Sequence, residues 1–348
     1  SVQIYGSRCY NTIALLSRFS MNVDVSRVKN VSRTAFKFEV VTPMFTGGAD
    51  PACAEIRAQS IKGLLRFWWR VFQSEPDIKK LKEEENRIFG STKGKSRFSI
   101  AVSCQEKPRM EDLNKGETYS VAGKSFSPGI IEYLAFGVCS YNSEQRKFVY
   151  LREHFTPESK FELHFTFYDD SIKNEVLKSL ALLVCYGGIG AKSRNGFGSV
   201  RLLDGELPDV GTIQPSHNLL PYPSFSKSTR LIEFKTQAPW VSALSEIGMA
   251  YRSMRISKKI GIEKHVFRNR ELLARPIIDR NREVAGGRLG KQFYLHVDRV
   301  EDGWRGKILI MPYAVHGGEK NETYRTIIAD AVKILEDYKN NKKPETIY

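Results

Sequence analysis

Apolar and polar positions alternate along the chain with two different periods. Phe36, Phe38 and Val40 alternate with polar neighbours, which predicts a half-buried strand that runs into a loop over residues 43–51. From Ser60 onward the apolar residues recur at helical spacing, so we predict a helix capped by Ser60. Further strand patterns occupy 97–103, 131–139, 161–168 and 199–203, and a second helix, capped at Asp170 or Ser171, ends at Gly187 and Gly188.

The order of these elements predicts an α+β fold. A strand, a helix, a block of strands, a helix and a last strand are the order of a ferredoxin-like (RRM-like) domain with an inserted hairpin. We therefore assign residues 31–204 to a first ferredoxin-like domain, with a polar surface excursion at 103–129. Residues 1–30 form an N-terminal extension, and because the first methionine is Met21, residues 1–20 could be an added sequence or a native one.

The second half repeats the pattern incompletely. Residues 205–228 contain four prolines among polar residues and are predicted to be a linker. Beyond it, a strand at 231–236, a helix at 241–254, a hairpin formed by 292–300 and 306–311, and a helix at 323–338 predict a degenerate ferredoxin-like domain over 229–348. This domain is one strand short, and the pattern leaves open whether another part of the chain supplies the missing edge. The predicted fold is thus two tandem ferredoxin-like domains with inserted hairpins.

The densest motif is the glycine-rich loop, residues 187–198, which reads GGIGAKSRNGFG. It is not a P-loop, because Ala191 and Tyr186 stand where that motif needs glycines and a helix precedes the loop. Ser193 stands where a dinucleotide fingerprint needs its third glycine, and residues 90–96 fail the P-loop spacing as well. A plain turn between helix and strand is the simplest interpretation.

The other residues of the loop favour an RNA-backbone contact instead. Glycines let backbone N–H groups approach phosphates, cations neutralise charge, and an aromatic ring offers a stacking face. The candidate RNA-binding residues in the loop are Lys192, Ser193, Arg194, Asn195 and Phe197. The candidate positions of close backbone approach are Gly47, Gly48, Gly187, Gly188, Gly190, Gly196 and Gly198.

A basic row on the first helix is a second candidate. Lys62, Arg66 and Arg70 share one face at i, i+4 and i+8, Arg57 lies just before them, and Glu55 is the one acid counted against them. Such a row often only solvates a helix, but the weak opposing charge favours RNA binding. Trp68 falls on the apolar face and is predicted to be core, as is Trp69.

Composition supports a polyanionic partner. The 348 residues carry 54 Lys and Arg against 39 Asp and Glu, a formal net charge of +15. Residues 251–291 hold twelve Lys and Arg against four Asp and Glu, so more than half of the excess lies there. This segment is predicted to be a second surface that faces RNA or a neighbouring subunit.

Other chemistry is sparse. The five cysteines are far apart and are predicted to be reduced and mostly in the core, and the six histidines show no metal-ligand spacing, so we expect no metal, cofactor or catalytic residue. His164 and His296 fall in strand patterns and are expected to be hydrogen-bonded sheet residues. No apolar run reaches the length of a membrane span, and we expect a cytoplasmic protein with no membrane partner.

Four motifs, in order, resemble the RAMP superfamily of CRISPR proteins. They are the TGG of residues 46–48, the stretch from Ile56 through the LLRFWWR of residues 64–70, the IFGS of residues 88–91 and the GFG that closes the glycine-rich loop. Within the superfamily the helix and the first loop resemble one subunit of type III-B (Cmr) effector complexes. The motifs span residues 36–203, and the second half matches loosely, through residues 290–312.

That resemblance implies tandem ferredoxin-like domains and a subunit without known catalysis. It implies contact with guide RNA near its 3′ region, with target RNA and with other Cmr subunits, in antiviral defence. Two alternatives stay open. Some RAMP relatives cleave RNA without a metal through a histidine, a role for which His265 beside Lys264 is the candidate. The basic surfaces could also bind an acidic protein neighbour.

Overall fold

The computed structural model of the chain describes residues 31–48, 50, 53–121, 127–261, 269–274, 289–314 and 319–342. Its first sheet is antiparallel, with strand order β2-β5-β1-β6. The strands are β1 (Ser32–Val40), β2 (Phe98–Ser103), β5 (Lys160–Phe167) and β6 (Val200–Asp204). The alternation predicted for the first strand is confirmed, because Phe36, Phe38 and Val40 are all buried on one face.

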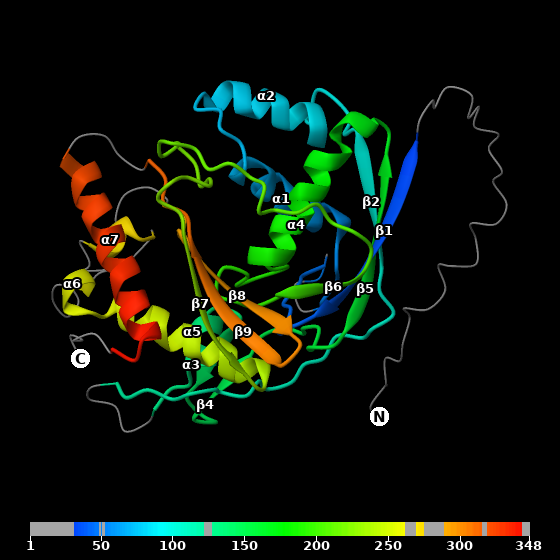
Figure 1. Cartoon of the computed structure of the whole chain (residues 1–348). Helices are drawn as coiled ribbons and strands as arrows, with labels where there is room; N and C mark the ends of the chain where they lie inside the picture. Colours follow the sequence, from blue (N-terminus) through cyan, green and yellow to red (C-terminus); the bar gives the residue numbers. More distant parts are fainter. Residues whose placement is uncertain are drawn as a thin grey trace, which may run out of the picture.

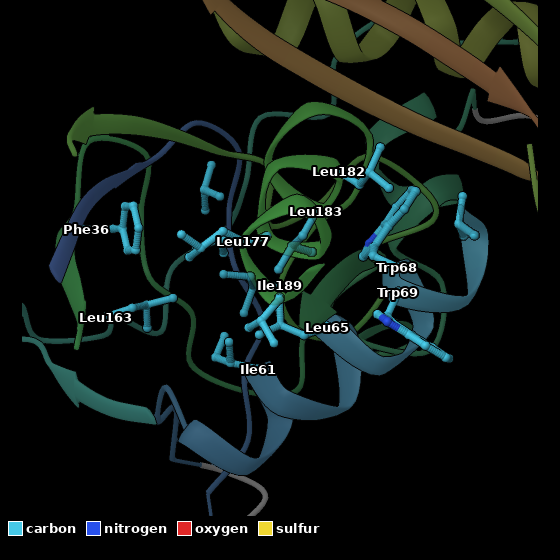
Figure 2. Packing of buried hydrophobic residues seen from close by; sticks show 14 of the residues in the cluster. Phe36, Ile61, Leu65, Trp68, Trp69, Leu163, Leu177, Leu182, Leu183 and Ile189 are labelled. Atoms are coloured by element: carbon cyan, nitrogen blue, oxygen red, sulfur yellow. The ribbon is translucent and has the colours of Figure 1, made fainter. Parts of the chain in front are cut away.

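Two helices cover that buried face. They are α1 (Ala58–Val71) and α4 (Lys173–Tyr186), and α2 (Ile78–Phe89) packs beside α1. Figure 2 shows Ile61 and Leu65 of α1 beside Leu177 and Leu183 of α4. Trp68 and Trp69 are each 2% exposed, as predicted, and the indole Nε1 of Trp69 donates to Glu175 at 2.8 Å.

The second sheet has three strands within the described residues, in the order β7-β9-β8. They are β7 (Arg230–Gln237), β8 (Phe293–Val300) and β9 (Gly303–Ile310). Helices α5 (Trp240–Arg255) and α7 (Glu319–Lys339) pack against this sheet, and α6 (Lys258–Gly261) is one short turn. The predicted strand, helix, hairpin and final helix of the second half are therefore all present.

The second sheet packs between the helices of the two halves (Figure 1), and its strands β8 and β9 contribute to the buried clusters of both. On β8, Phe293, Leu295 and Val297 pack in the cluster of α5, whereas Tyr294 packs in the cluster of α1 and α4. The molecule is thus layered as first sheet, helices α1 and α4, second sheet, and helices α5 and α7. This layering brings the glycine-rich loop of the first half against the second half.

The prediction of a strand over residues 131–139 is wrong. Its first part forms α3 (Ile130–Ala135), and a hairpin follows, made of β3 (Cys139–Asn142) and β4 (Lys147–Tyr150). Five of the six residues of α3 are buried, and the helix packs against α5, so this short run has no clear period that separates helix from strand. The Glu132 carboxylate accepts from the Gly129 N–H at 2.8 Å, which fixes the start of the helix.

Two predicted caps are also wrong. Arg57, not Ser60, occupies the N-cap position of α1 and makes no side-chain cap. Before α4, a short 3₁₀ turn (Asp170–Ile172) is capped by Asp169, which accepts from the Ser171 N–H at 3.0 Å. A second such turn covers Arg270–Leu272.

The predicted linker packs on the first half. Tyr222 is 8% exposed and its hydroxyl donates to the carbonyl of Glu75 at 2.7 Å. The predicted extension, residues 1–30, lies outside the described residues.

Candidate nucleic-acid interface

The glycine-rich loop is shaped by close backbone contacts within the first half. Gly198 has φ +68°, and a Cβ placed there would lie 2.0 Å from the carbonyl oxygen of Ile189. Gly190 has φ +95°, and a Cβ there would lie 2.3 Å from the carbonyl oxygen of Phe45. These glycines are required by the fold itself, whatever the loop binds.

The loop docks on the edge of the second sheet. The Leu295 N–H of β8 donates to the carbonyl of Arg194 at 3.2 Å, and a Cβ on Gly196 would lie 2.5 Å from Leu244 Cδ1 of α5. The Thr42 hydroxyl donates to the carbonyl of Gly196 at 2.7 Å. The loop therefore forms the joint between the two halves.

Arg194 is held inside this joint. Its guanidinium lies over the rings of Phe67 and Tyr294, 5.2 and 5.0 Å from their centroids, and donates to the carbonyl of Lys291 at 3.1 Å. These cation–π contacts hold the guanidinium between the two halves, and no carboxylate of the described residues forms an ion pair with it.

Lys291 completes a group of cations at the joint. Its Nζ donates to the carbonyl of Arg194 at 2.9 Å and to Oδ1 of Asn195 at 2.6 Å, and lies 4.1 Å from the centroid of the Tyr251 ring. Burial, followed by the charges of Arg255, Arg194 and Lys192, lowers the pKa of Lys291 well below its ordinary value. We call Lys192, Arg194, Arg255 and Lys291 the cationic joint.

The predicted loop residues thus come together, with one exception. Lys192, Ser193, Arg194 and Asn195 are partly exposed at the joint. Phe197 is fully buried, 5.5 Å from Phe45 between ring centroids, so the prediction that it offers a stacking face is wrong. It follows Gly196, whose φ of +89° turns the chain so that the next side chain points into the core.

The basic row of α1 is largely tied to α2. Arg66 pairs with Glu85 at 3.1 Å, and Arg70 pairs with the same carboxylate. Lys62 lies 4.9 Å from the centroid of the Phe98 ring, and burial, aided by the charge of Arg66, lowers its pKa. The sequence analysis counted only Glu55 against this row and missed Glu85, which is 6% exposed.

The first loop pairs with the glycine-rich loop, because the Ala191 N–H donates to the carbonyl of Phe45 at 2.7 Å. Arg57 is exposed, and an added Cβ on Gly47 would meet no described atom within 4 Å, whereas one on Gly48 would lie 2.6 Å from the Glu55 carboxylate. Arg57, Lys62 and Gly47 are therefore open to solvent or partly so, and RNA contact there stays a prediction.

The second basic segment lies mostly outside the described residues. Of its cations, six are described: Arg252, Arg255, Lys258, Lys259, Arg270 and Lys291. Arg255 and Lys291 belong to the cationic joint, so one end of this segment meets the glycine-rich loop. The two basic regions of the sequence therefore share one surface at that point.

Two of the histidines lie in strands, as the sequence predicts. His296 lies in β8 as predicted, with Nδ1 2.6 Å from the carbonyl oxygen of Gly187 and Nε2 3.1 Å from Asp298, and His164 lies in β5 near Glu162. His265 lies outside the described residues. Where the structure describes the chain, no three His, Cys, Asp or Glu side chains group as metal ligands and no helix is long and apolar enough to cross a membrane.

None of the cysteines that the structure describes forms a disulfide. Cys139 is buried, Cys104 and Cys185 are partly exposed, and Cys53 is exposed, so Cys53 is not a core residue. Cys9 lies outside the described residues.

The sequence is similar to one protein family and to two curated proteins. The family model of the RAMP superfamily matches residues 37–201. The chain is 31% identical over 180 residues to the CRISPR system Cmr subunit Cmr1-2 of Pyrococcus furiosus, covering 48% of this chain and 93% of that protein. It is 30% identical over 163 residues to Cmr1-1 of the same organism, covering 45% of this chain and 44% of that protein.

Solved structures share the fold. Apo Cmr1 from Pyrococcus furiosus matches with a TM-score of 0.53 and 19% identity, covering 86% of this chain and 96% of that one. A chain of a type III-B Cmr-beta complex bound to cognate target RNA matches with a TM-score of 0.50 and 13% identity, covering 86% of this chain and 99% of that one. The chain therefore belongs to the RAMP superfamily, and within it to the Cmr1-like proteins.

Proposed function

We propose that this protein is an RNA-binding subunit, without catalysis of its own, of a type III-B Cmr effector complex in antiviral defence. The relative matched over 93% of its length is named as a Cmr subunit, which supports the assembly. One observation on this chain supports the RNA: the cationic joint brings loop cations of the first half against Lys291 of the second, and Lys192, Arg194 and Lys291 make no ion pair within the described residues.

Guide RNA and target RNA are the proposed polyanions, with contact near the 3′ region of the guide. Phosphates would approach Lys192 and would favour the protonated form of Lys291 by their negative charge, while Asn195 and Ser193 offer polar groups beside them. Arg57 and Lys62 are a second, separate contact region, and Arg66 and Arg70 contribute less because Glu85 already neutralises much of their charge.

We also propose that both halves are ferredoxin-like units. The β-α-β-β-α-β order with strands β2-β5-β1-β6 supports this for the first half. The order β7-β9-β8 with α5 and α7 fits the same plan without its last strand.

RNA binding is tested by changing one loop cation in the full chain. Lys192→Gln should lower the affinity for labelled single-stranded RNA about twofold to fivefold, and Lys192→Glu roughly tenfold, almost equally for unrelated sequences. Lys82→Gln, an equal charge change at an exposed position of α2, should leave the affinity unchanged. Equal affinities of the wild type and both Lys192 variants would remove the loop from the RNA site.

The absence of catalysis is tested separately. Labelled guide RNA incubated with the pure chain in EDTA should stay intact over hours. Cleavage at a defined position that a 2′-deoxy substitution blocks would identify a metal-independent endoribonuclease instead.

A further inference from the structure

A cleft of about 700 Å³ opens beside the cationic joint, between the α3-to-β4 insert and α5. Aromatic residues are concentrated in its lining: Tyr133, Phe136, Tyr141 and Phe148 of the insert, and Tyr119 of the segment that precedes α3. Its volume falls within the range of roughly 300–1,000 Å³ typical of sites for single small molecules. Leu134 and Tyr251 of the lining belong to the core cluster of α5, so the cleft opens at the edge of that core.

The aromatic wall is partly open to solvent. Phe136 is 68% exposed and Tyr141 is 43% exposed, both among the most exposed large apolar side chains that the structure describes. Tyr119 and Tyr133 meet edge to face at 6.1 Å, which holds the Tyr133 ring upright in the wall. Exposed, fixed ring faces of this kind are suited to stacking against a flat aromatic ligand.

The inner side of the cleft is cationic. Lys291 and Arg255 line it, and the Arg255 guanidinium donates to the Tyr133 hydroxyl at 3.1 Å. Glu132 is the one carboxylate among the described lining residues, and it is engaged with the Gly129 N–H at the start of α3. A ligand that combines a flat ring with a negative charge matches both walls.

We infer that this cleft receives one unstacked nucleotide of the bound single-stranded RNA, with its base against Phe136 and its phosphate toward Lys291 and Arg255. This inference rests on the proposed function and extends it, because Arg255 and Lys291 belong both to the cationic joint and to the lining of the cleft. Bases in a duplex are stacked inside the helix, so only a single-stranded or flipped nucleotide can enter.

The test uses the full chain and a single-stranded RNA that carries 4-thiouridine at successive positions. One position should crosslink to a peptide that contains Phe136. Phe136→Ala should lower the RNA affinity about 5- to 100-fold, as expected for the loss of one stacked base, and Phe136→Trp should restore it. Tyr168→Ala removes an aromatic side chain that is 50% exposed on the first sheet and serves as the matched control.

An abasic substitution at the crosslinked position separates stacking from other effects. It should weaken binding to the wild type and leave binding to Phe136→Ala unchanged, because the two changes remove the same contact. Unchanged affinity of Phe136→Ala, with Lys192→Glu still impaired, would overturn the nucleotide cleft and leave the proposed function standing. If the wild type fails to bind RNA, both proposals fall. If the cleft crosslinks only to a neighbouring protein in the assembled complex, the nucleotide cleft alone falls.

Discussion

At the scale of single residues, Gly198 and Gly47 differ in whether the fold has room for a side chain. At Gly198 a Cβ would meet the Ile189 carbonyl at a forbidden distance, and φ is +68°. At Gly47 a Cβ would meet no described atom within 4 Å. Gly198→Ala should therefore lower the free energy of unfolding by several kcal/mol, whereas Gly47→Ala should change it by less than about 0.5 kcal/mol.

Denaturant unfolding of the two glycine variants measures this difference directly. If Gly198→Ala proves as stable as the wild type, the loop is not held by the backbone contact described. A large loss of unfolding free energy in Gly47→Ala would show that other groups fill the space beside Gly47.

Asp298 makes the stability of the fold depend on pH. Burial alone would raise its pKa, but the hydrogen bond and charge of His296 and the Lys307 ammonium, 2.7 Å away, lower the pKa to about 2. A carboxylate with a lowered pKa stabilises the fold above its unfolded pKa of 3.8, and that contribution is lost as the pH falls from about 4 toward 2.

The wild type should therefore lose about 2 kcal/mol of stability over that interval through this one group. Asp298→Asn should be less stable at neutral pH, and its stability should fall less steeply in acid. Urea unfolding at a series of pH values compares the slopes, and parallel curves would rule out the linkage.

At the scale of elements, the contact between α1 and α2 depends on one carboxylate. Glu85 is 6% exposed and binds both Arg66 and Arg70. Glu85→Gln should leave these two cations poorly compensated and lower the free energy of unfolding by about 1–3 kcal/mol. It should also raise the affinity for RNA if the freed cations face the phosphates.

Glu84→Gln is the matched control, because Glu84 is exposed and pairs with Arg87 only on the helix surface. The free energy of unfolding of Glu84→Gln should differ from that of the wild type by less than about 0.5 kcal/mol. Equal stabilities of the Glu84 and Glu85 variants in thermal or denaturant unfolding would contradict the stabilising role of Glu85.

The same elements show what a sequence can predict. Strands such as β1 could be predicted because one face is buried and the other polar, and the helices α1, α5 and α7 because their apolar faces recur at helical spacing. The helix α3 could not, since it is only six residues long and five of them are buried. No local period marks such a segment.

The site was predicted in part for a related reason. Lys192, Arg194 and Asn195 are neighbours in sequence, so the loop itself identified them. Lys291 joins them only because the second sheet packs on α1 and α4, and Glu85 meets Arg66 only through the packing of two helices. Phe197 points inward because of the turn at Gly196, which spacing does not reveal.

At the scale of the whole molecule, the four layers turn two separate basic regions into one surface. Because Lys192, Arg194 and Lys291 face that surface without carboxylate partners in the described residues, the logarithm of the RNA affinity should fall with the logarithm of salt concentration with a slope of about −2 or steeper. Lys192→Gln should reduce the slope by about 0.7, and a flat salt response of the wild type would contradict an electrostatic contact.

The central claim is that RNA in the assembled complex lies against the joint between the two halves. Ultraviolet crosslinking of guide and target RNA within the complex, mapped by mass spectrometry, tests it most directly. Crosslinked peptides should contain Lys192 to Asn195 or Lys291, and these crosslinks should weaken in Lys192→Glu. RNA crosslinks confined to other surfaces of this subunit, or crosslinks from the joint to an acidic protein neighbour alone, would contradict the account.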